Sequence, residues 1–218
     1  FVLPFRFAFP SGVFPGETGT CLATLAPSTN CELVVEYNPL NTGAHTGTVN
    51  LNYFDGTNSQ STSNGMTGTG KTAAKLKISE LEPYDYGVIA DGFSLDYTFN
   101  VTNIGGVAAA SVAGTLATGT VFTYAGGTFP GGGTCTGGTI APLATCTVVV
   151  RFTPSSANAF SDTFTVSYND GVDPQSEARG VAGTAVSRAD LQISETDRHN
   201  IANIAAGFTA NHTFTITN

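Results

Sequence analysis

Apolar and polar residues alternate with a period of two along several short stretches of the chain. Leu33, Val35 and Tyr37 fall on one face of an extended strand, and they alternate with Glu32, Val34 and Glu36 on the other face. The same alternation recurs over residues 49–53, 97–101, 148–152 and 164–168. It predicts β-strands with one buried face. Gly, Pro, Asn and Asp separate these stretches at short intervals, and no sustained helical stripe occurs, so the pattern indicates an all-β fold of the β-sandwich type.

The chain also repeats itself, because Cys31 and Cys146 begin two similar stretches that lie 115 residues apart. The alignment needs no gap between Cys31 and Asn103, and roughly 27 of about 73 aligned positions are identical, far more than chance would give. The clearest pairs are CELVVEYNP (31–39) with CTVVVRFTP (146–154), LKISE (76–80) with LQISE (191–195), and GFSLDYTFNVTN (92–103) with GFTANHTFTITN (207–218). We therefore predict tandem β-sandwich units.

The repeat divides the chain into three parts. Residues 73–186 form one complete unit, which is long enough to bury a core of its own. Residues 1–72 correspond to the C-terminal two-thirds of such a unit, and residues 187–218 correspond to the N-terminal strands of a further one. The two end parts are complementary, and together they lack only a short stretch of a full unit.

Charge and composition exclude several classes of function. The 218 residues carry a net charge of −8, and only 11% of them are charged. Basic residues are scarce, so the sequence predicts no nucleic-acid partner. No apolar run reaches the roughly 18 residues of a membrane-spanning helix.

The cysteines favour disulfides over a metal centre. Their separations of ten and eleven residues, and the lack of a C-x-x-C motif, predict two local disulfides. Disulfides place the protein in an oxidising compartment, so we expect an extracellular or cell-surface location. The histidines are scattered along the chain, which disfavours a zinc site. The cysteines are Cys21, Cys31, Cys135 and Cys146, and the histidines are His45, His199 and His212.

The stretch GMTGTGKT, Gly65–Thr72, matches the phosphate-binding loop pattern G-x-x-x-x-G-K-[ST]. A phosphate-binding loop must lie between a strand and a helix. Here Leu76 and Ile78 alternate with lysines, which predicts a strand, and the equivalent stretch 180–187 has no lysine. We interpret Gly65–Thr72 as a closing strand and an interdomain joint, and we expect no nucleotide, cofactor or metal.

Acidic residues raise calcium binding as an alternative. Asp55-Gly56 and Asp170-Gly171 stand between predicted strands, where Asp-Gly is typical of a β-turn. Calcium prefers six to eight oxygen ligands, and few carboxylates are local. A second acidic group is interpreted as a solvated face, with half of a calcium site as the alternative. It comprises Glu80, Glu82, Asp85, Asp91 and Asp96.

An ordered set of short motifs resembles the choice-of-anchor D family of bacterial repeats, which is similar to ASH/Hydin-type immunoglobulin-like domains. The motifs are Tyr86-Gly87-Val88, Phe99-x-Val101-Thr102-Asn103, Cys135, Ile140-Ala141-Pro142, Cys146, Phe152-x-Pro154 and Gly183-Thr184. The third copy departs from the set, with Ile201-Ala202-Asn203 in place of Tyr-Gly-Val. The resemblance implies an immunoglobulin-like module of large exported surface proteins, with a structural or adhesive role and no catalytic residues.

We therefore expect a structural subunit of an exported surface or extracellular fibre, and not an enzyme. A sandwich without its first strands exposes apolar surface and unpaired edges. Residues 187–218 of one copy are expected to complete residues 1–72 of the next, head to tail, by strand addition. The residues predicted to make this contact are Phe208, Phe214, Ile216, Val49 and Leu51. Folding back within one chain, or continuation as a longer array, are the alternatives.

An adhesin or carbohydrate-binding module is the other class of function, with a surface glycan or protein as partner. Exposed aromatic side chains on one loop face would favour it. The candidates are Tyr84, Tyr86 and the glycine-rich stretch 124–134.

Overall fold

The computed structural model describes residues 7–195 and 199–218, and within them it contains strands and one short 3-10 helix but no α-helix. This confirms the all-β prediction. The elements are β1 (Phe7–Ala8), the 3-10 helix (Pro10–Gly12), β2 (Glu36–Tyr37), β3 (Gly43–Phe54), β4 (Ser59–Gly70), β5 (Leu76–Ile78), β6 (Tyr84–Ala90), β7 (Leu95–Asn103), β8 (Ala110–Leu116), β9 (Phe122–Tyr124), β10 (Thr145–Phe152), β11 (Ala159–Asn169), β12 (Pro174–Val186), β13 (Gln192–Ile193) and β14 (Ile216–Thr217).

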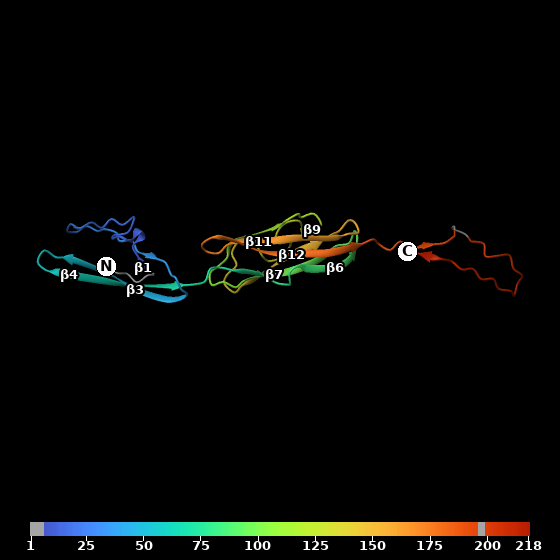
Figure 1. The fold of residues 1–218 in the computed structure, drawn as a ribbon, viewed down its shortest axis with the longest axis horizontal. Helices are drawn as coiled ribbons and strands as arrows, with labels where there is room; N and C mark the ends of the chain where they lie inside the picture. Colours follow the sequence, from blue (N-terminus) through green and yellow to red (C-terminus); the bar gives the residue numbers. More distant parts are fainter. Residues whose placement is uncertain (1–6, 196–198) are drawn as a thin grey trace.

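Strands β5 to β12 form a β-sandwich of two four-stranded sheets, which we call the central sandwich. One sheet has the order β5-β7-β10-β9 and the other the order β6-β12-β11-β8. Its pairings are antiparallel except for β6 beside β12, which is parallel. The central sandwich lies between an N-terminal segment and a C-terminal segment, and its long strands run along the long axis of the molecule (Figure 1).

The core of the central sandwich comes from the alternating apolar positions. Side chains from both sheets are fully buried between the layers, which is the result that a period of two produces when one face of each strand is covered. The largest of them are Phe99, Phe122, Phe152 and Phe164. The disulfide between Cys135 and Cys146 lies at the margin of this core, and both cysteines are buried.

The N-terminal segment, residues 7–70, contains two separate strand pairs. β1 pairs with β2, and the long hairpin β3–β4 pairs along its whole length. A small core holds the two pairs together, because the Tyr37 hydroxyl and His45 Nδ1 are hydrogen-bonded at 2.7 Å and the Phe7 ring packs on Tyr37. Gly68 lies directly beneath the Tyr37 ring, where a Cβ atom would approach within 2.6 Å of a ring carbon.

In the C-terminal segment, residues 190–218, the described residues form one short strand pair, β13–β14. Ser194 and Thr215 extend this pair by a backbone hydrogen bond of 2.7 Å. The side chain of Asn218 closes the other end, since its Oδ1 accepts a hydrogen bond from the Asp190 amide at 3.0 Å.

The pairing of strands in the end segments follows the same offset as the sequence repeat. Phe7 lies opposite Tyr37 as Phe122 lies opposite Phe152. The β3–β4 hairpin has the alignment of β11–β12, with Ala44 opposite Thr69 and Ala159 opposite Thr184. Ile193 lies opposite Ile216 as Ile78 lies opposite Val101. Each end segment thus reproduces the local strand pairing of one part of the central sandwich.

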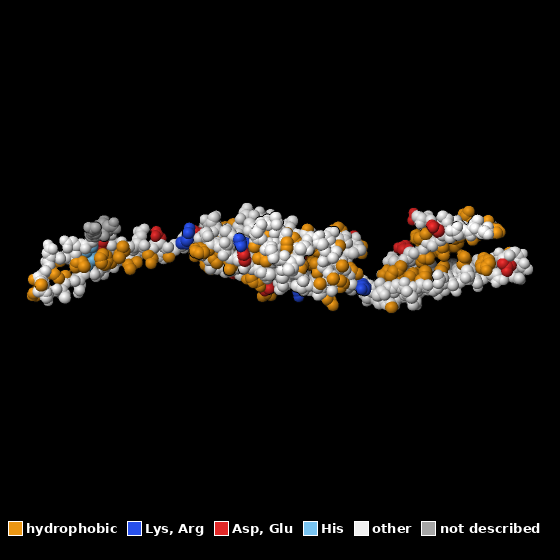
Figure 2. Space-filling view, turned by 180° about the vertical axis from the view of Figure 1, so that it is seen from behind, with side chains coloured by type: hydrophobic (Ala, Val, Ile, Leu, Met, Phe, Trp, Pro, Cys, Tyr) orange, Lys and Arg blue, Asp and Glu red, His pale blue; other side chains and the backbone are white. Residues whose placement is uncertain are grey.

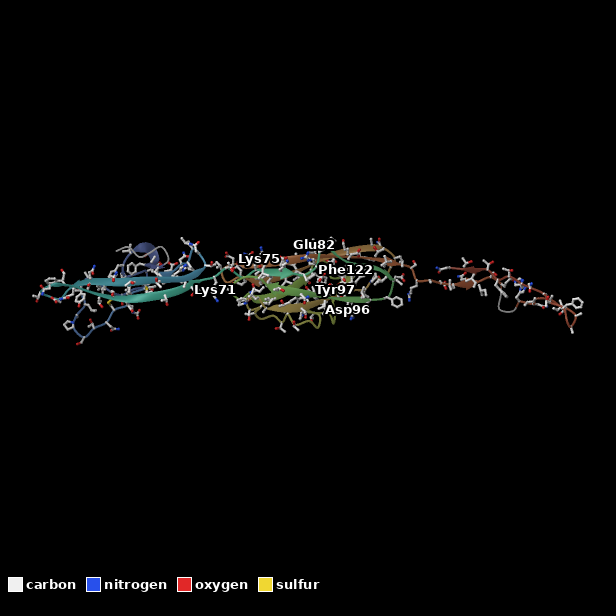
Figure 3. The ribbon with its side chains drawn as sticks, turned by 90° about the horizontal axis from the view of Figure 1, so that it is seen from below. Lys71, Lys75, Glu82, Asp96, Tyr97 and Phe122 are labelled. Atoms are coloured by element: carbon white, nitrogen blue, oxygen red, sulfur yellow. A yellow bond between two sulfur atoms is a disulfide. The ribbon has the colours of Figure 1, made fainter. Side chains whose placement is uncertain are left out.

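The joint between the N-terminal segment and the central sandwich is hydrogen-bonded on both sides. The Ala74 amide donates to the Asp170 carbonyl at 2.9 Å, and the Gly106 amide donates to the Thr72 carbonyl at 3.1 Å. Lys71 and Lys75 lie in this joint (Figure 3). The backbone of residues 72–75 is therefore held by the turns at one end of the central sandwich.

The Gly65–Thr72 stretch continues strand β4 to Gly70 and then enters this joint, which leads to β5. Residues 71–75 are not helical. The strand-to-helix context of a phosphate-binding loop is not formed here, in agreement with the interpretation as a closing strand and joint.

Candidate functional site: the open faces of the terminal segments

The central sandwich shows which neighbouring strands the equivalent strands of a complete unit have. β10 has β9 on one side and β7 on the other, and β12 lies between β11 and β6. Both strands are therefore internal, and the buried faces of the two sheets cover each other.

The N-terminal segment has the counterparts of β9 to β12 but lacks those neighbours. Among the described residues, β2 pairs with β1 alone and β4 pairs with β3 alone. The edge of β2 that corresponds to the β7 side of β10 is open, as is the edge of β4 that corresponds to the β6 side of β12. Open edges of this kind present unpaired N–H and C=O groups that can pair with a further strand.

The apolar face of the N-terminal segment is only partly covered. Leu51 is 40% exposed, whereas its counterpart Val166 in the central sandwich is 0% exposed. Tyr53 is also exposed and Val49 is half-buried, although their counterparts Tyr168 and Phe164 are buried. Two arms of this segment diverge, and hydrophobic side chains line the hollow between them, at the right of Figure 2. The hollow has apolar walls and open strand edges.

The C-terminal segment exposes the complementary apolar side chains. Ile216 is 65% exposed, whereas its counterpart Val101 is 0% exposed, and Ile193 and Phe214 are exposed where Ile78 and Phe99 are buried. Hydrophobic side chains gather along this segment at the left of Figure 2. The two terminal segments therefore each expose a set of core positions, and the sets come from different parts of the unit.

Phe208 differs from the other residues predicted at this contact. It is 73% exposed, but its counterpart Phe93 is 59% exposed within the complete central sandwich. This position therefore does not need to be covered when a sandwich is complete. Val49, Leu51, Phe214 and Ile216 correspond to buried core positions and remain the stronger candidates.

The disulfide between Cys21 and Cys31 attaches one arm of the N-terminal segment to the stretch that precedes β2. The Thr20 amide donates to the Glu32 carbonyl at 2.9 Å, and the Glu32 amide donates back to Thr20 Oγ1 at 2.8 Å. The four cysteines thus form the two local disulfides expected from their spacing. Disulfides indicate an oxidising environment outside the cytoplasm, and no helix among the described residues is long and apolar enough to cross a membrane.

The Asp-Gly turns use their carboxylates internally. Asp55 accepts hydrogen bonds from the Asn58 amide, the Gln60 side chain and the Thr57 amide, and these bonds hold the pKa of Asp55 below its usual value. Asp170 accepts the amides of Val172 and Asp173 in the same way. Each carboxylate therefore stabilises its own turn, as expected for this dipeptide.

The acidic residues of the central sandwich do not form one cluster. Asp96 makes a bidentate ion pair with Arg151 at 2.6 and 2.8 Å, and this hydrogen-bonded pair lowers the pKa of the carboxyl group. Glu82 pairs with Arg179, Asp91 pairs with Arg188, and Asp85 accepts the Gly87 amide. Asp96 and Tyr97 are neighbours on one strand, whereas Glu82 lies on another part of the surface (Figure 3). Glu80, the fifth residue of this group, is hydrogen-bonded to Tyr97. The five carboxylates have separate partners and do not converge on one calcium site.

A shallow depression beside Glu82 includes Thr118, Asp162 and Gly180. Asp162 is buried, which by itself would raise the pKa of its carboxyl group, but hydrogen bonds from Thr118, Thr163 and Gly119 lower that pKa below its ordinary value of 3.8. Its oxygens accept the Thr118 hydroxyl at 2.7 Å and the Gly119 amide at 3.0 Å. Asp162 therefore anchors the turn after β8.

The aromatic residues proposed for glycan binding lie mainly in the core. Tyr86 and Tyr124 are buried, and the Tyr86 hydroxyl donates to the Val150 carbonyl at 2.7 Å. Tyr84 packs against Tyr86 and stacks on Tyr97. The glycine-rich stretch folds back onto β10, since the Val149 amide donates to the Pro130 carbonyl. These residues do not form an exposed aromatic platform.

Two of the histidines that are scattered along the chain meet in space. His199 and His212 stack with ring centroids 3.7 Å apart, and both contact Glu195. The sequence offered a signal for this cluster, because the repeat aligns His199 with Tyr84 and His212 with Tyr97, two rings that stack in the central sandwich. The spacing of the three residues along the chain does not indicate this cluster.

Comparison with known proteins gives only distant similarity. No protein-family model matches the chain, and no curated protein matches it. Among solved structures, the ASH/PapD-like domain of human CEP192 (PapD-like domain 7) matches 54% of this chain and 89% of that chain, with 11% identity and a TM-score of 0.40. A protein of unknown function from Porphyromonas gingivalis matches 84% of each chain at 11% identity and a TM-score of 0.39.

The Vibrio cholerae VesB protease matches 50% of this chain and 31% of that chain, with 15% identity and a TM-score of 0.39. At these scores the matches supply no function, and the assignment of a β-sandwich follows from the strand pairings themselves.

Proposed function

We propose that this chain is a structural subunit of an exported surface or extracellular fibre built from tandem immunoglobulin-like domains, in which the two terminal segments complete each other by strand addition. The observation that carries the proposal is the matched pairing of strands. The N-terminal segment has the pairings of the second half of the central sandwich, and the C-terminal segment has those of its beginning.

The central sandwich supplies the expected contacts. Val148 lies opposite Phe99 across β10 and β7, so Leu33 is expected opposite Phe214. Val181 lies opposite Tyr84 in the parallel pair, so Met66 is expected opposite His199. In this arrangement the C-terminal segment occupies both open edges of the N-terminal segment.

Burial of apolar side chains supplies the driving force. Full burial of an Ile or Phe side chain contributes about 1.5–3 kcal/mol relative to exposure. Ile193, Phe214 and Ile216 are all exposed in the C-terminal segment, and Leu51 and Tyr53 are exposed in the N-terminal one. Repeated head-to-tail addition of this kind produces an open filament, because the two contacting surfaces are different.

A disulfide-trapping experiment tests the proposed contact between the segments. Arg151 and Asp96 lie opposite each other and point outward in the central sandwich, and their counterparts are Glu36 and Asn211. We expect a mixture of the single variants E36C and N211C to form a disulfide-linked dimer under mild oxidation, because opposed strand positions lie within disulfide reach. The double variant E36C/N211C should form a ladder of linked species on a non-reducing gel.

The matched control is T57C mixed with N211C. Thr57 lies at the tip of the β3–β4 hairpin, away from the expected contact. Equal yields of linked dimer from the two mixtures would contradict the proposal. A linked monomer as the main product of E36C/N211C would instead show that the two segments join within one chain. The disulfide yield reports whether the two segments fit each other. It therefore tests the same contact if the segments belong to a longer array.

A further inference from the structure

Glu195, His199 and His212 form a compact side-chain cluster in the C-terminal segment. Glu195 Oε2 lies 3.1 Å from His199 Nδ1, and Glu195 Oε1 lies 3.5 Å from His212 Nε2. The donor atoms of the three side chains all lie within 4.8 Å of one another. The three side chains are partly exposed, so an ion can reach them from solvent.

The central sandwich contains the same arrangement with different chemistry. The counterparts of the three residues are Glu80, Tyr84 and Tyr97. The two tyrosine rings stack with centroids 3.9 Å apart, and the hydrogen bond to Glu80 raises the pKa of Tyr97 to about 12. Glu80 and Glu195 both have a positive φ, 77° and 80°, so the same backbone bend directs both carboxylates. The unit thus places a glutamate beside two stacked rings wherever these strands form.

The replacement of both tyrosines by histidines changes what this arrangement can bind. A phenol with a raised pKa keeps its proton at neutral pH and is a poor metal ligand, whereas a neutral imidazole is among the commonest. Two histidines and one carboxylate form a known type of zinc-binding set, with a water completing four-coordination. Donor atoms about 2.0–2.1 Å from a tetrahedral ion lie roughly 3.3 Å apart. The two distances from Glu195 are close to this value but involve its two different oxygens, and one donor atom from each side chain lies within 4.8 Å of the others, so the side chains must draw slightly closer around an ion.

We propose that Glu195, His199 and His212 bind a divalent transition-metal ion of the zinc type. Glu195 lies two residues after β13, His199 lies in the stretch equivalent to β6, and His212 lies in the stretch that leads into β14. Binding requires the two stacked imidazoles to turn so that one nitrogen of each faces the ion. A bound ion would link three stretches of the C-terminal segment, where backbone hydrogen bonds among the described residues are few.

Titration of the whole chain with Zn²⁺ alone tests the site. We expect one ion per chain by calorimetry, and Co²⁺ should give the visible absorption of a four-coordinate site that Zn²⁺ then removes. E195Q should bind at least about tenfold more weakly, since even the loss of an outer partner of a metal ligand costs 10–100-fold. H199Y/H212Y restores the residues of the central sandwich and should abolish binding.

A gain-of-site variant keeps the test independent of any loss of folding. Y84H/Y97H places two histidines beside Glu80 in the central sandwich, and the stoichiometry should rise from one ion per chain to two. Binding that persists in H199Y/H212Y, or no binding by the unmodified chain, would overturn the proposal. The result does not depend on strand exchange, because the three ligands belong to one segment.

Discussion

Replacement of Asn103 by alanine should strongly destabilise the central sandwich. Asn103 lies at the end of β7, and its side chain is fully buried. Its Oδ1 accepts the amides of Gly105 at 2.9 Å and Lys75 at 3.2 Å, and its Nδ2 donates to the carbonyls of Val107 at 2.8 Å and Ile140 at 3.0 Å. One side chain therefore ties the domain joint, the turn after β7 and the stretch before β10.

The expected loss follows from these four hydrogen bonds. Each contributes about 1 kcal/mol net, so we expect a loss of about 4 kcal/mol for the alanine variant. The Ile140 carbonyl keeps its hydrogen bond from the Ala109 amide at 2.9 Å, and the other three backbone groups lose their bond to Asn103. N103D should be at least as unstable at neutral pH, because its second oxygen would face the carbonyl oxygens of Val107 and Ile140.

Urea unfolding followed by circular dichroism and tyrosine fluorescence measures this loss as a shift in midpoint at constant slope. Asn218 provides the matched control, since it holds the equivalent position but is exposed and accepts one hydrogen bond from the Asp190 amide. N218A should change the stability of the central sandwich by less than about 0.5 kcal/mol. A loss below about 1 kcal/mol for N103A, or equal losses for both variants, would refute the reasoning.

Three further substitutions test the central sandwich. D162N should lower the free energy of unfolding by about 1–3 kcal/mol at pH 7. The pKa of Asp162 in the folded protein lies below 3.8, so the extra stability of the wild type should be complete above pH 3.8 and should disappear as the pH falls through the folded pKa. Acid titration of both proteins measures this dependence. Y86F should lower the unfolding free energy by about 1 kcal/mol in urea, through loss of the hydrogen bond to Val150; an unchanged midpoint would contradict that role. C135S/C146S should lower it by about 3 kcal/mol, because a loop of 11 residues is no longer closed; calorimetry of the variant and the parent provides the comparison.

The strand pattern was predictable from the sequence because burial of one face imposes a period of two. Leu76, Phe99 and Val148 each belong to an alternating apolar set on a different strand, and all three are fully buried in the structure. The repeat also anticipated the similar pairing of the β3–β4 and β11–β12 hairpins, since the Asp-Gly turn that sets each hairpin occurs in both copies.

The side-chain chemistry of the candidate sites was less predictable. Tyr86 was a candidate for an exposed aromatic, yet it is buried and donates a hydrogen bond inside the core. The sequence cannot distinguish these two environments, because a tyrosine can satisfy its hydroxyl in water or on a buried carbonyl. Glu195 and His212 are far apart along the chain, and only the folded hairpin brings them together. Contacts across strands depend on pairing that local periodicity does not specify.

The direction of the strands determines how the central sandwich would carry tension. The chain enters through the joint at residues 72–75 and leaves at the end of β12, at the opposite end of the sandwich, and its long strands run along the line that joins these points (Figure 1). Hydrogen bonds between strands are directed across the strands. A force along the long axis therefore shears β12 against both of its neighbours, β6 and β11. The hydrogen bonds on the two sides of β12 must then break together and cannot break one after another.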